Sequence, residues 1–184
     1  GAAMVVVDDG YVRVERAWRR TAAAALACPL VEVATNVVVP VETTSPKEEY
    51  AAATLRPKIY RHLAEFLVPL RETPLRVAPV EPDVESLDIG DTEAVLARLA
   101  IDRSVGRSPF YRGGPSEAAK RLRAFVAKKL AAYAEDRNDP SLDGVSGLSP
   151  YLHFGQISPL AVALAVKKGP AYGQAPFLEE LIGR

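Results

Sequence analysis

Residues 4–34, MVVVDDGYVRVERAWRRTAAAALACPLVEVA, decide the fold class of the first part of the chain. Residues 4–7 form an apolar, β-branched run that ends at Asp8-Asp9-Gly10, a pattern typical of a buried strand followed by a turn. Residues 11–27 have helical spacing of their apolar positions, and residues 30–34 form a second strand candidate. A strand, a helix and a strand within about 30 residues predict a parallel, Rossmann-like βαβ unit.

Two strands make a poor sheet, because isolated strand pairs are marginal in stability and leave their edges open. We therefore expect that neighbouring strands of an α/β domain lie outside this chain, which is an α/β remnant. The chain opens Gly1-Ala2-Ala3-Met4, so we also expect an upstream natural start or residual tag residues. Trp18 lies on the apolar face of the predicted helix and is expected to be a core residue.

The composition is that of ordinary globular material, with 184 residues, 48% of them hydrophobic and 25% charged. Basic and acidic residues number 23 each, so whole-chain charge indicates no polyanionic partner. The single Cys28 excludes an internal disulfide, and one Cys with two His gives no credible zinc set. No apolar run approaches the ~18 residues of a membrane span, so we expect a cytoplasmic protein without a membrane partner.

The middle of the chain changes character along its length. Ser45-Pro46-Lys47-Glu48 has the pattern of a helix start with a capping box, and Pro57 should kink or split the helix that follows. Residues 69–90 are rich in proline and predict an extended interdomain linker. A short helix is predicted over 92–101, where apolar residues recur at helical spacing.

The second half reads as helical throughout. Residues 116–136 predict the clearest helix, with Tyr133 at the end of its buried stripe. Ser149-Pro150 and Ser158-Pro159 each resemble a cap followed by a first turn, and a last helix is predicted from Pro176. The fold class is therefore an α/β remnant, a Pro-rich linker and an all-α part.

The segment Ser146-Gly147-Leu148-Ser149 could carry chemistry because two hydroxyls and a glycine precede a helix start. Free backbone N–H groups at such a terminus, with hydroxyls beside them, suit a phosphate group. The alternative is a loop with two ordinary N-caps.

Local charge offers a second candidate. Residues 107–130 contain seven basic side chains against Glu117 alone, so this strip could meet a nucleic-acid backbone. The alternative is the solvated face of an amphipathic helix. The basic residues are Arg107, Arg112, Lys120, Arg121, Arg123, Lys128 and Lys129.

Two further features lie near the end of the chain. Tyr133 precedes a polar turn and could lie against a ligand, or it could be a core tyrosine whose hydroxyl reaches water. Glu180 and Arg184 are four residues apart and share a helix face near Phe177, which also suits a plain surface ion pair.

Taken together, these stretches resemble one family. Residues 137–140 (RNDP) and 146–158 (SGLSPYLHFGQIS) resemble the flavin-domain signature of class II cyclobutane pyrimidine dimer photolyases, and residues 177–182 (FLEELI) are similar to the next family block. Gly183 stands where the family usually has a bulkier apolar residue. Three upstream stretches match in the same order, namely 36–41 (NVVVPV), 47–52 (KEEYAA) and 54–59 (TLRPKI).

The resemblance implies a two-domain enzyme that repairs UV-damaged DNA with light and FAD, and we expect it to be a monomer. It implies that residues 1–68 end the N-terminal α/β domain, that 69–90 form the linker, and that 91–184 begin the helical FAD-binding domain. The alternative is a cryptochrome-like flavin photoreceptor without repair activity. We expect this 184-residue chain to be an internal fragment that is inactive alone, with exposed Leu and Phe side chains in its helical half.

The resemblance also implies roles for single residues. Glu180 corresponds to the acid that hydrogen-bonds the pyrimidine dimer. The residues that correspond to FAD contacts are Tyr133, Ser146, Gly147, Leu148, Ser149, Phe177 and Arg184. The basic residues placed near the DNA path are Arg112, Lys120, Arg121 and Arg123.

Overall fold

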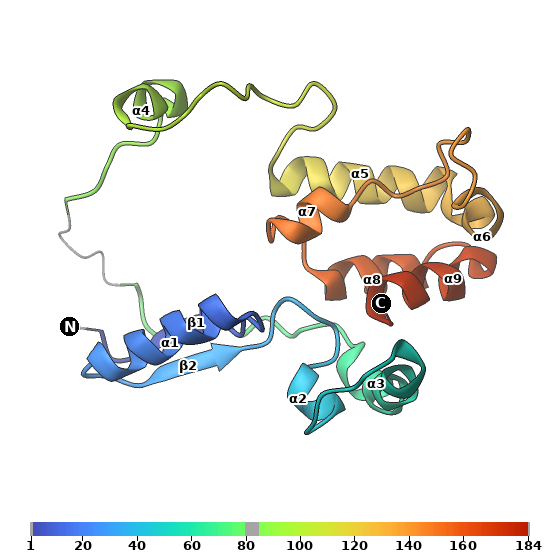
Figure 1. Ribbon diagram of the computed structural model, residues 1–184, viewed down its shortest axis with the longest axis horizontal. Helices are drawn as coiled ribbons and strands as arrows, with labels where there is room; N and C mark the ends of the chain where they lie inside the picture. Colours follow the sequence, from blue (N-terminus) through green and yellow to red (C-terminus); the bar gives the residue numbers. More distant parts are fainter. Residues whose placement is uncertain (1, 80–84, 184) are drawn as a thin grey trace. The chain divides into compact units, whose positions relative to one another are not determined.

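The computed structural model describes residues 2–79 and 85–183 (Figure 1). Contacts divide the chain into two compact units, one made of Gly1–Pro69 with Gly113–Arg184 and the other of Leu70–Arg112. The predicted domains, residues 1–68, 69–90 and 91–184, remain a prediction.

The first unit begins with the predicted βαβ arrangement. Strand β1 (Val5–Asp8) is followed by helix α1 (Arg13–Ala25) and strand β2 (Leu30–Val33). The strands pair in parallel, with Val5 opposite Leu30 and Asp8 opposite Val33. The α/β class and the parallel pairing are therefore confirmed.

Helix α1 corrects one expectation, because Trp18 is 66% exposed instead of forming part of a core. No residue of α1 is buried. Within the described residues the sheet has only two strands of four residues each. So small a sheet offers too little apolar surface to cover the whole stripe of the helix.

The helix predicted from Ser45 starts seven residues later. Helix α2 (Val41–Thr44) ends at Ser45, and α3 (Ala52–Phe66) follows. The Ser45 hydroxyl accepts from the Lys47 N–H and donates to Glu49 at 2.8 Å, so it forms a local turn instead of a cap. Such side chain-to-backbone bonds compete with helix formation.

The second unit contains α4 (Thr92–Arg98), where the Asp91 carboxylate accepts from the Ala94 N–H at 3.1 Å. Helix α4 begins where the predicted helix over 92–101 begins, and it is shorter. Glu93 pairs with Arg103 and Arg107, which folds the loop after α4 back onto the helix. The described part of the predicted linker contains no helix or strand.

The long helix predicted over 116–136 is broken into three pieces. Helix α5 (Pro115–Lys128) is followed by a 3₁₀ turn, η1 (Leu130–Ala132), and by α6 (Tyr133–Asp136). At the break the backbone comes close to α9 (Ala171–Ile182), because a Cβ built on Gly173 would lie 1.6 Å from the Leu130 carbonyl oxygen. Close tertiary packing thus accompanies the break that helical periodicity did not predict.

Two prolines lie inside helices. Pro57 was expected to kink or split its helix, and Pro176 was expected to start one. Pro57 lies in α3, which is not split, and Pro176 lies in α9, which begins five residues earlier than predicted. Each proline is in the second turn, so each removes only one hydrogen bond near the helix start. The remaining helices are α7 (Ser149–His153) and α8 (Pro159–Lys167).

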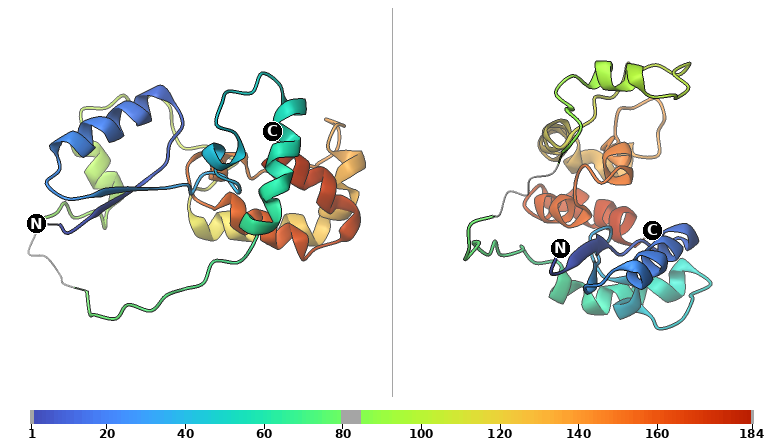
Figure 2. Two further views of the ribbon diagram at one scale, coloured as in Figure 1. Left: turned by 90° about the horizontal axis from the view of Figure 1, so that it is seen from below. Right: turned by 90° about the vertical axis from the view of Figure 1, so that its left-hand side faces the viewer.

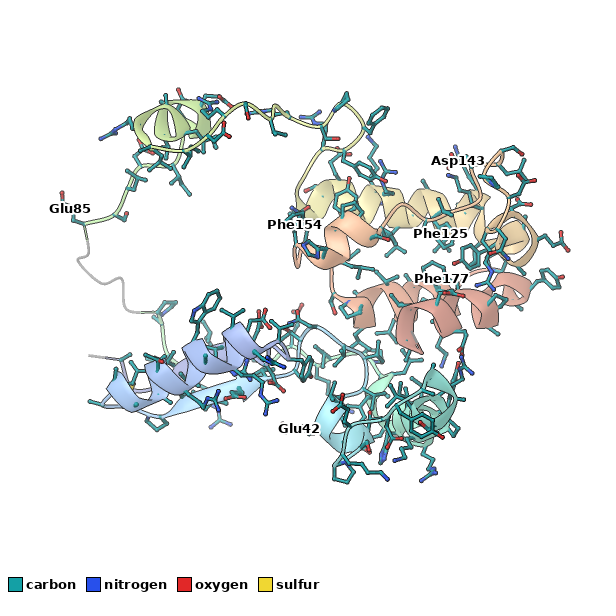
Figure 3. The ribbon with its side chains drawn as sticks, in the orientation of Figure 1. Glu42, Glu85, Phe125, Asp143, Phe154 and Phe177 are labelled. Atoms are coloured by element: carbon teal, nitrogen blue, oxygen red, sulfur yellow. The ribbon has the colours of Figure 1, made fainter. Side chains whose placement is uncertain are left out.

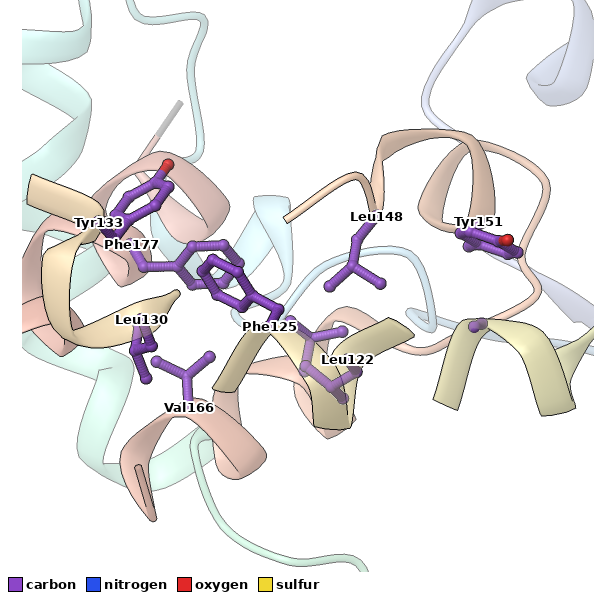
Figure 4. Close-up of a cluster of buried hydrophobic side chains, with 10 residues drawn as sticks. Leu122, Phe125, Leu130, Tyr133, Leu148, Tyr151, Val166 and Phe177 are labelled. Atoms are coloured by element: carbon purple, nitrogen blue, oxygen red, sulfur yellow. The ribbon is translucent and has the colours of Figure 1, made fainter. Parts of the chain in front are cut away.

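Two apolar clusters hold the first unit together. One joins α5, α6, α7, α8 and α9 (Figure 4). The other joins α3 to α8 and α9, so the helix assigned by sequence to the α/β part packs on the helical part (Figure 2). No helix of the described residues has the length and apolar character needed to cross a membrane.

The expectation of exposed Leu and Phe side chains in residues 91–184 is met at four described positions. These are Leu99, Phe110, Leu142 and Phe154, of which Phe110 is 81% and Phe154 is 72% exposed. Phe125 and Phe177 are buried between α5 and α9, away from Phe154 in Figure 3. The principal apolar residues of this half therefore find partners among the described helices.

Candidate functional site

Three aromatic rings meet where α5, α6 and α9 come together (Figure 4). The Phe125 ring lies 4.8 Å from the Phe177 ring and 5.6 Å from the Tyr133 ring, measured between centroids. Tyr133 and Phe177 contact each other edge to face at 5.2 Å. The two aromatics that the sequence assigned to FAD are thus neighbours, and Phe125 is a third member that sequence reasoning missed.

Glu180 lies beside this aromatic cluster. The Arg137 guanidinium donates to the Glu180 carboxylate, and it lies 5.8 Å from the centre of the Tyr133 ring. The hydrogen bond to Glu180 raises the pKa of Arg137. The sequence did not identify Arg137 as the partner of Glu180; it lies in the RNDP stretch that carried the family resemblance.

Helix α9 is held from its other side by α3. The Glu179 carboxylate forms an ion pair with Arg56, and it accepts from the Tyr60 hydroxyl at 2.9 Å. Sequence reasoning missed this contact. A signal was present in the helical spacing of Arg56 and Tyr60, which lie four residues apart on one face of α3.

The loop before α7 has the glycine geometry that a close approach requires. Gly147 has a φ of +63°, a conformation that a side chain disfavours. The Ser146 hydroxyl accepts from the Leu148 N–H at 3.3 Å, while the Leu148 side chain is fully buried. Ser149 was expected to be the N-cap, but Leu148 occupies that position and Ser149 is the first helical residue.

A basic pocket of about 260 Å³ lies between this loop and α5. Three cationic side chains, the Ser146 residue and one face of Phe125 line it. The lining residues are Glu117, Lys120, Arg121, Ala124, Phe125, Lys129 and Ser146. Two residues assigned by sequence to DNA, Lys120 and Arg121, thus lie at the same pocket as a residue assigned to FAD.

Arg123 is exposed on α5, and Arg112 belongs to the second unit. Arg184 lies outside the described residues. The predicted contacts with DNA and with FAD remain predictions at these positions and at the other site residues.

The donor set of the pocket suits the phosphates of a flavin dinucleotide. Arg and Lys side chains and a serine hydroxyl are the groups that proteins use to hold phosphate oxygens. Tyr133, Phe125 and Phe177 are buried in the adjoining core and contact one another. The donors of the pocket thus fit the phosphates of FAD in chemical type.

Comparisons with known proteins identify the family of the chain. Residues 1–78 match the family model described as DNA photolyase. The deoxyribodipyrimidine photo-lyase of Methanothermobacter thermautotrophicus is 45% identical over 186 residues, which covers 100% of this chain and 40% of that protein. The enzyme of the same name from Potorous tridactylus is 35% identical over 140 residues, covering 76% of this chain and 26% of that protein.

The fold has a solved counterpart as well. A bacterial class III photolyase from Agrobacterium tumefaciens superposes with a TM-score of 0.62 at 20% sequence identity, covering 98% of this chain and 39% of that structure. At that identity the likeness concerns the fold alone. The chain spans less than half the length of each of these relatives, and in sequence and fold it belongs to the photolyase family.

Proposed function

We propose that the intact protein repairs cyclobutane pyrimidine dimers in DNA, driven by light and with FAD as its cofactor. When bound and reduced, FAD would supply the photoexcited electron that opens the dimer. The names of the similar proteins support this proposal, and the chain's residues would bind and orient the two reactants. We assign it to class II because residues 146–158 read SGLSPYLHFGQIS.

The observation that carries the proposal is the position of Glu180 beside the aromatic cluster. A carboxylate that accepts hydrogen bonds from a dimer must be fixed in direction. Arg137 fixes Glu180, because it donates to the carboxylate while lying against the Tyr133 ring. A charged acceptor of this kind forms the stronger class of hydrogen bond.

We assign the cofactor's ring system to Tyr133 and Phe177 and its phosphates to residues 146–149. Aromatic side chains favour stacked or edge contacts with a planar ring, and the loop offers hydroxyls and a glycine backbone. Exposed Arg123 and Lys120, with Arg112, are assigned to the DNA backbone. No described contact favours the photoreceptor alternative, and the retained Glu180 favours repair.

The test is binding of FAD and of a dimer-containing oligonucleotide by the purified chain. We expect flavin to stay with the chain through gel filtration, seen by absorbance and fluorescence. We expect Glu180→Gln to weaken binding of the damaged strand by about tenfold or more, because a hydrogen bond to a charged acceptor is lost. Undamaged DNA should bind equally well to the parent chain and to Glu180→Gln.

Glu135→Gln is the matched control, because Glu135 is an exposed carboxylate near the same helices. It should change neither affinity. A chain that retains no flavin and does not distinguish damaged from undamaged DNA would contradict the proposal. Illumination of the flavin-loaded chain with the damaged strand tests the separate prediction that these 184 residues are inactive alone.

A further inference from the structure

We propose that Arg121 is a phosphate-binding residue of the cofactor site and sets its preference for a dinucleotide pyrophosphate. The sequence alone placed this residue with the DNA contacts. This inference rests on the proposed function, because it names the group that the basic pocket beside α5 would hold. The pocket supplies Arg121, Lys120, Lys129 and Ser146 around about 260 Å³.

The Arg121 side chain is directed toward the loop by two contacts. A Cβ built on Gly147 would lie 2.7 Å from Arg121 Nη1, so the guanidinium lies directly beside this glycine. The guanidinium carbon also lies 5.8 Å from the centre of the Tyr151 ring, within cation–π range. A guanidinium fixed in this way is preorganised to donate to a phosphate.

Gly147 therefore has a different use from the one expected from sequence. The family resemblance assigned Gly147 itself to the FAD contacts. In the structure the space beside Gly147 is taken by Arg121. A phosphate that reaches this side of the loop would meet the guanidinium as well as the Ser146 hydroxyl.

The charge balance of the pocket suits an anion. Lys129 pairs with Asp143 at 2.6 Å, and Lys120 lies 3.8 Å from Glu117. Three cationic side chains thus face two carboxylates, which leaves the group positive. Two of these cations meet the loop before α7, Arg121 beside Gly147 and Lys129 at Asp143.

Phe125 lies at the border between the basic pocket and the aromatic cluster. It is one of the residues that line the pocket, and its ring also lies 4.8 Å from the Phe177 ring. One residue therefore belongs both to the pocket that holds the phosphate donors and to the buried aromatic cluster. Arg121 is also half-buried, whereas Arg123 on the same helix is exposed as a contact to a DNA backbone would be.

The experiment measures binding of four probes to the chain and to Arg121→Gln: FAD, ADP, riboflavin and a short undamaged duplex. We expect the variant to bind FAD and ADP about tenfold or more weakly, because both contain a pyrophosphate. Riboflavin carries no phosphate, so its affinity should not change. Lys128→Gln, which removes an exposed charge from the same helix, should leave FAD and ADP binding as they are.

Arg121→Lys separates loss of binding from loss of fold. It keeps the charge and loses the planar fork of the guanidinium. Its FAD and ADP affinities should therefore lie between those of the parent chain and of Arg121→Gln, with an unchanged circular dichroism spectrum. Equal FAD and ADP binding by all Arg121 variants would overturn the inference. So would a loss confined to the duplex, which would return Arg121 to the DNA contacts.

The outcome for the proposed function is read separately. A parent chain that binds FAD while the Arg121 variants bind it equally well leaves the flavin proposal standing and removes only this inference. A parent chain that binds ADP through Arg121 but takes up no flavin supports this inference and removes the flavin proposal. A parent chain that binds neither FAD nor ADP overturns both.

Discussion

Arg137 at the end of α6 and Glu180 in α9 form a hydrogen-bonded ion pair that joins two helices beside the aromatic cluster. The two side chains are partly buried, and the Tyr133 ring lies next to the guanidinium. The pair therefore links the end of a short helix to the helix that carries Phe177. It fixes the direction of the Glu180 carboxylate, whose side chain remains 28% exposed.

This pairing predicts that substitutions of the two residues are not additive. Arg137→Ala and Glu180→Ala should each lower the thermal midpoint by a few degrees, because each leaves the other charge without its partner. The double variant should lose little more than the worse single variant, since residues in contact are coupled. Full additivity of the two effects in circular dichroism melts would contradict the pairing.

The aromatic cluster predicts a large effect at Phe125, which is 1% exposed and contacts both Phe177 and Tyr133. Phe125→Ala should reduce the free energy of unfolding by about 3–5 kcal/mol, because a buried ring leaves a cavity. Phe154→Ala is the control, since its ring is 72% exposed and should cost little. Urea unfolding of both variants measures the difference, and equal costs would place Phe125 outside a packed core.

Gly173 is predicted to tolerate no side chain. A Cβ there would lie 1.6 Å from the Leu130 carbonyl oxygen and 2.6 Å from the carbonyl carbon, and backbone atoms cannot move aside cheaply. Gly173→Ala should force α9 away from η1 and destabilise the helical core by several kcal/mol, near the upper end of single-substitution effects. Gly106→Ala, where the Cβ would meet nothing within 4 Å, should leave the unfolding curve unchanged.

Local patterns in the sequence predicted elements better than their partners. Residues 4–34 carry a strand, a helix and a strand in adjacent stretches, so the parallel pairing followed from spacing alone. The break after α5 did not, because it coincides with a contact between Leu130 and Gly173, residues 43 positions apart. The helix start at Ser45 failed for a similar reason, since Ser45 and Glu49 are engaged by Lys58.

The candidate site divides in the same way. Tyr133, Phe177 and Glu180 could be named from family resemblance, and the structure places them together. Arg137 and Phe125 could not be named as their partners, because a one-dimensional pattern does not say which side of a helix faces which neighbour. Arg121 was grouped by charge with Arg123, which is exposed, whereas Arg121 is half-buried and lies beside Gly147.

The Glu49 carboxylate predicts an acid-dependent loss of stability in the first unit. Hydrogen bonds from Lys58, then from Ser45 and Thr54, lower the pKa of Glu49 from 4.5 to about 2. Its side chain is 7% exposed, so these partners lie close around it. In the unfolded chain the same carboxyl returns to its ordinary pKa, and the difference links folding to pH.

The direction of the pH dependence follows from the lowered pKa of Glu49. Above about pH 4.5 Glu49 is ionised in both states, and its contacts contribute their full stabilisation; as pH falls toward 2 the unfolded chain takes up the proton first, and the contribution is lost. We therefore expect the midpoint difference between the parent chain and Glu49→Gln to be constant from pH 7 to about pH 5.5 and to shrink steadily below pH 4.5.

Glu48→Gln removes one negative charge from an exposed neighbouring position and controls for the change in net charge. Lys58→Met should reproduce the behaviour of Glu49→Gln, because it removes the partner that lowers the pKa most. Chemical unfolding at half-unit pH steps measures all four proteins. A midpoint difference that stays the same down to pH 3 would show that Glu49 titrates alike in the folded and unfolded chains.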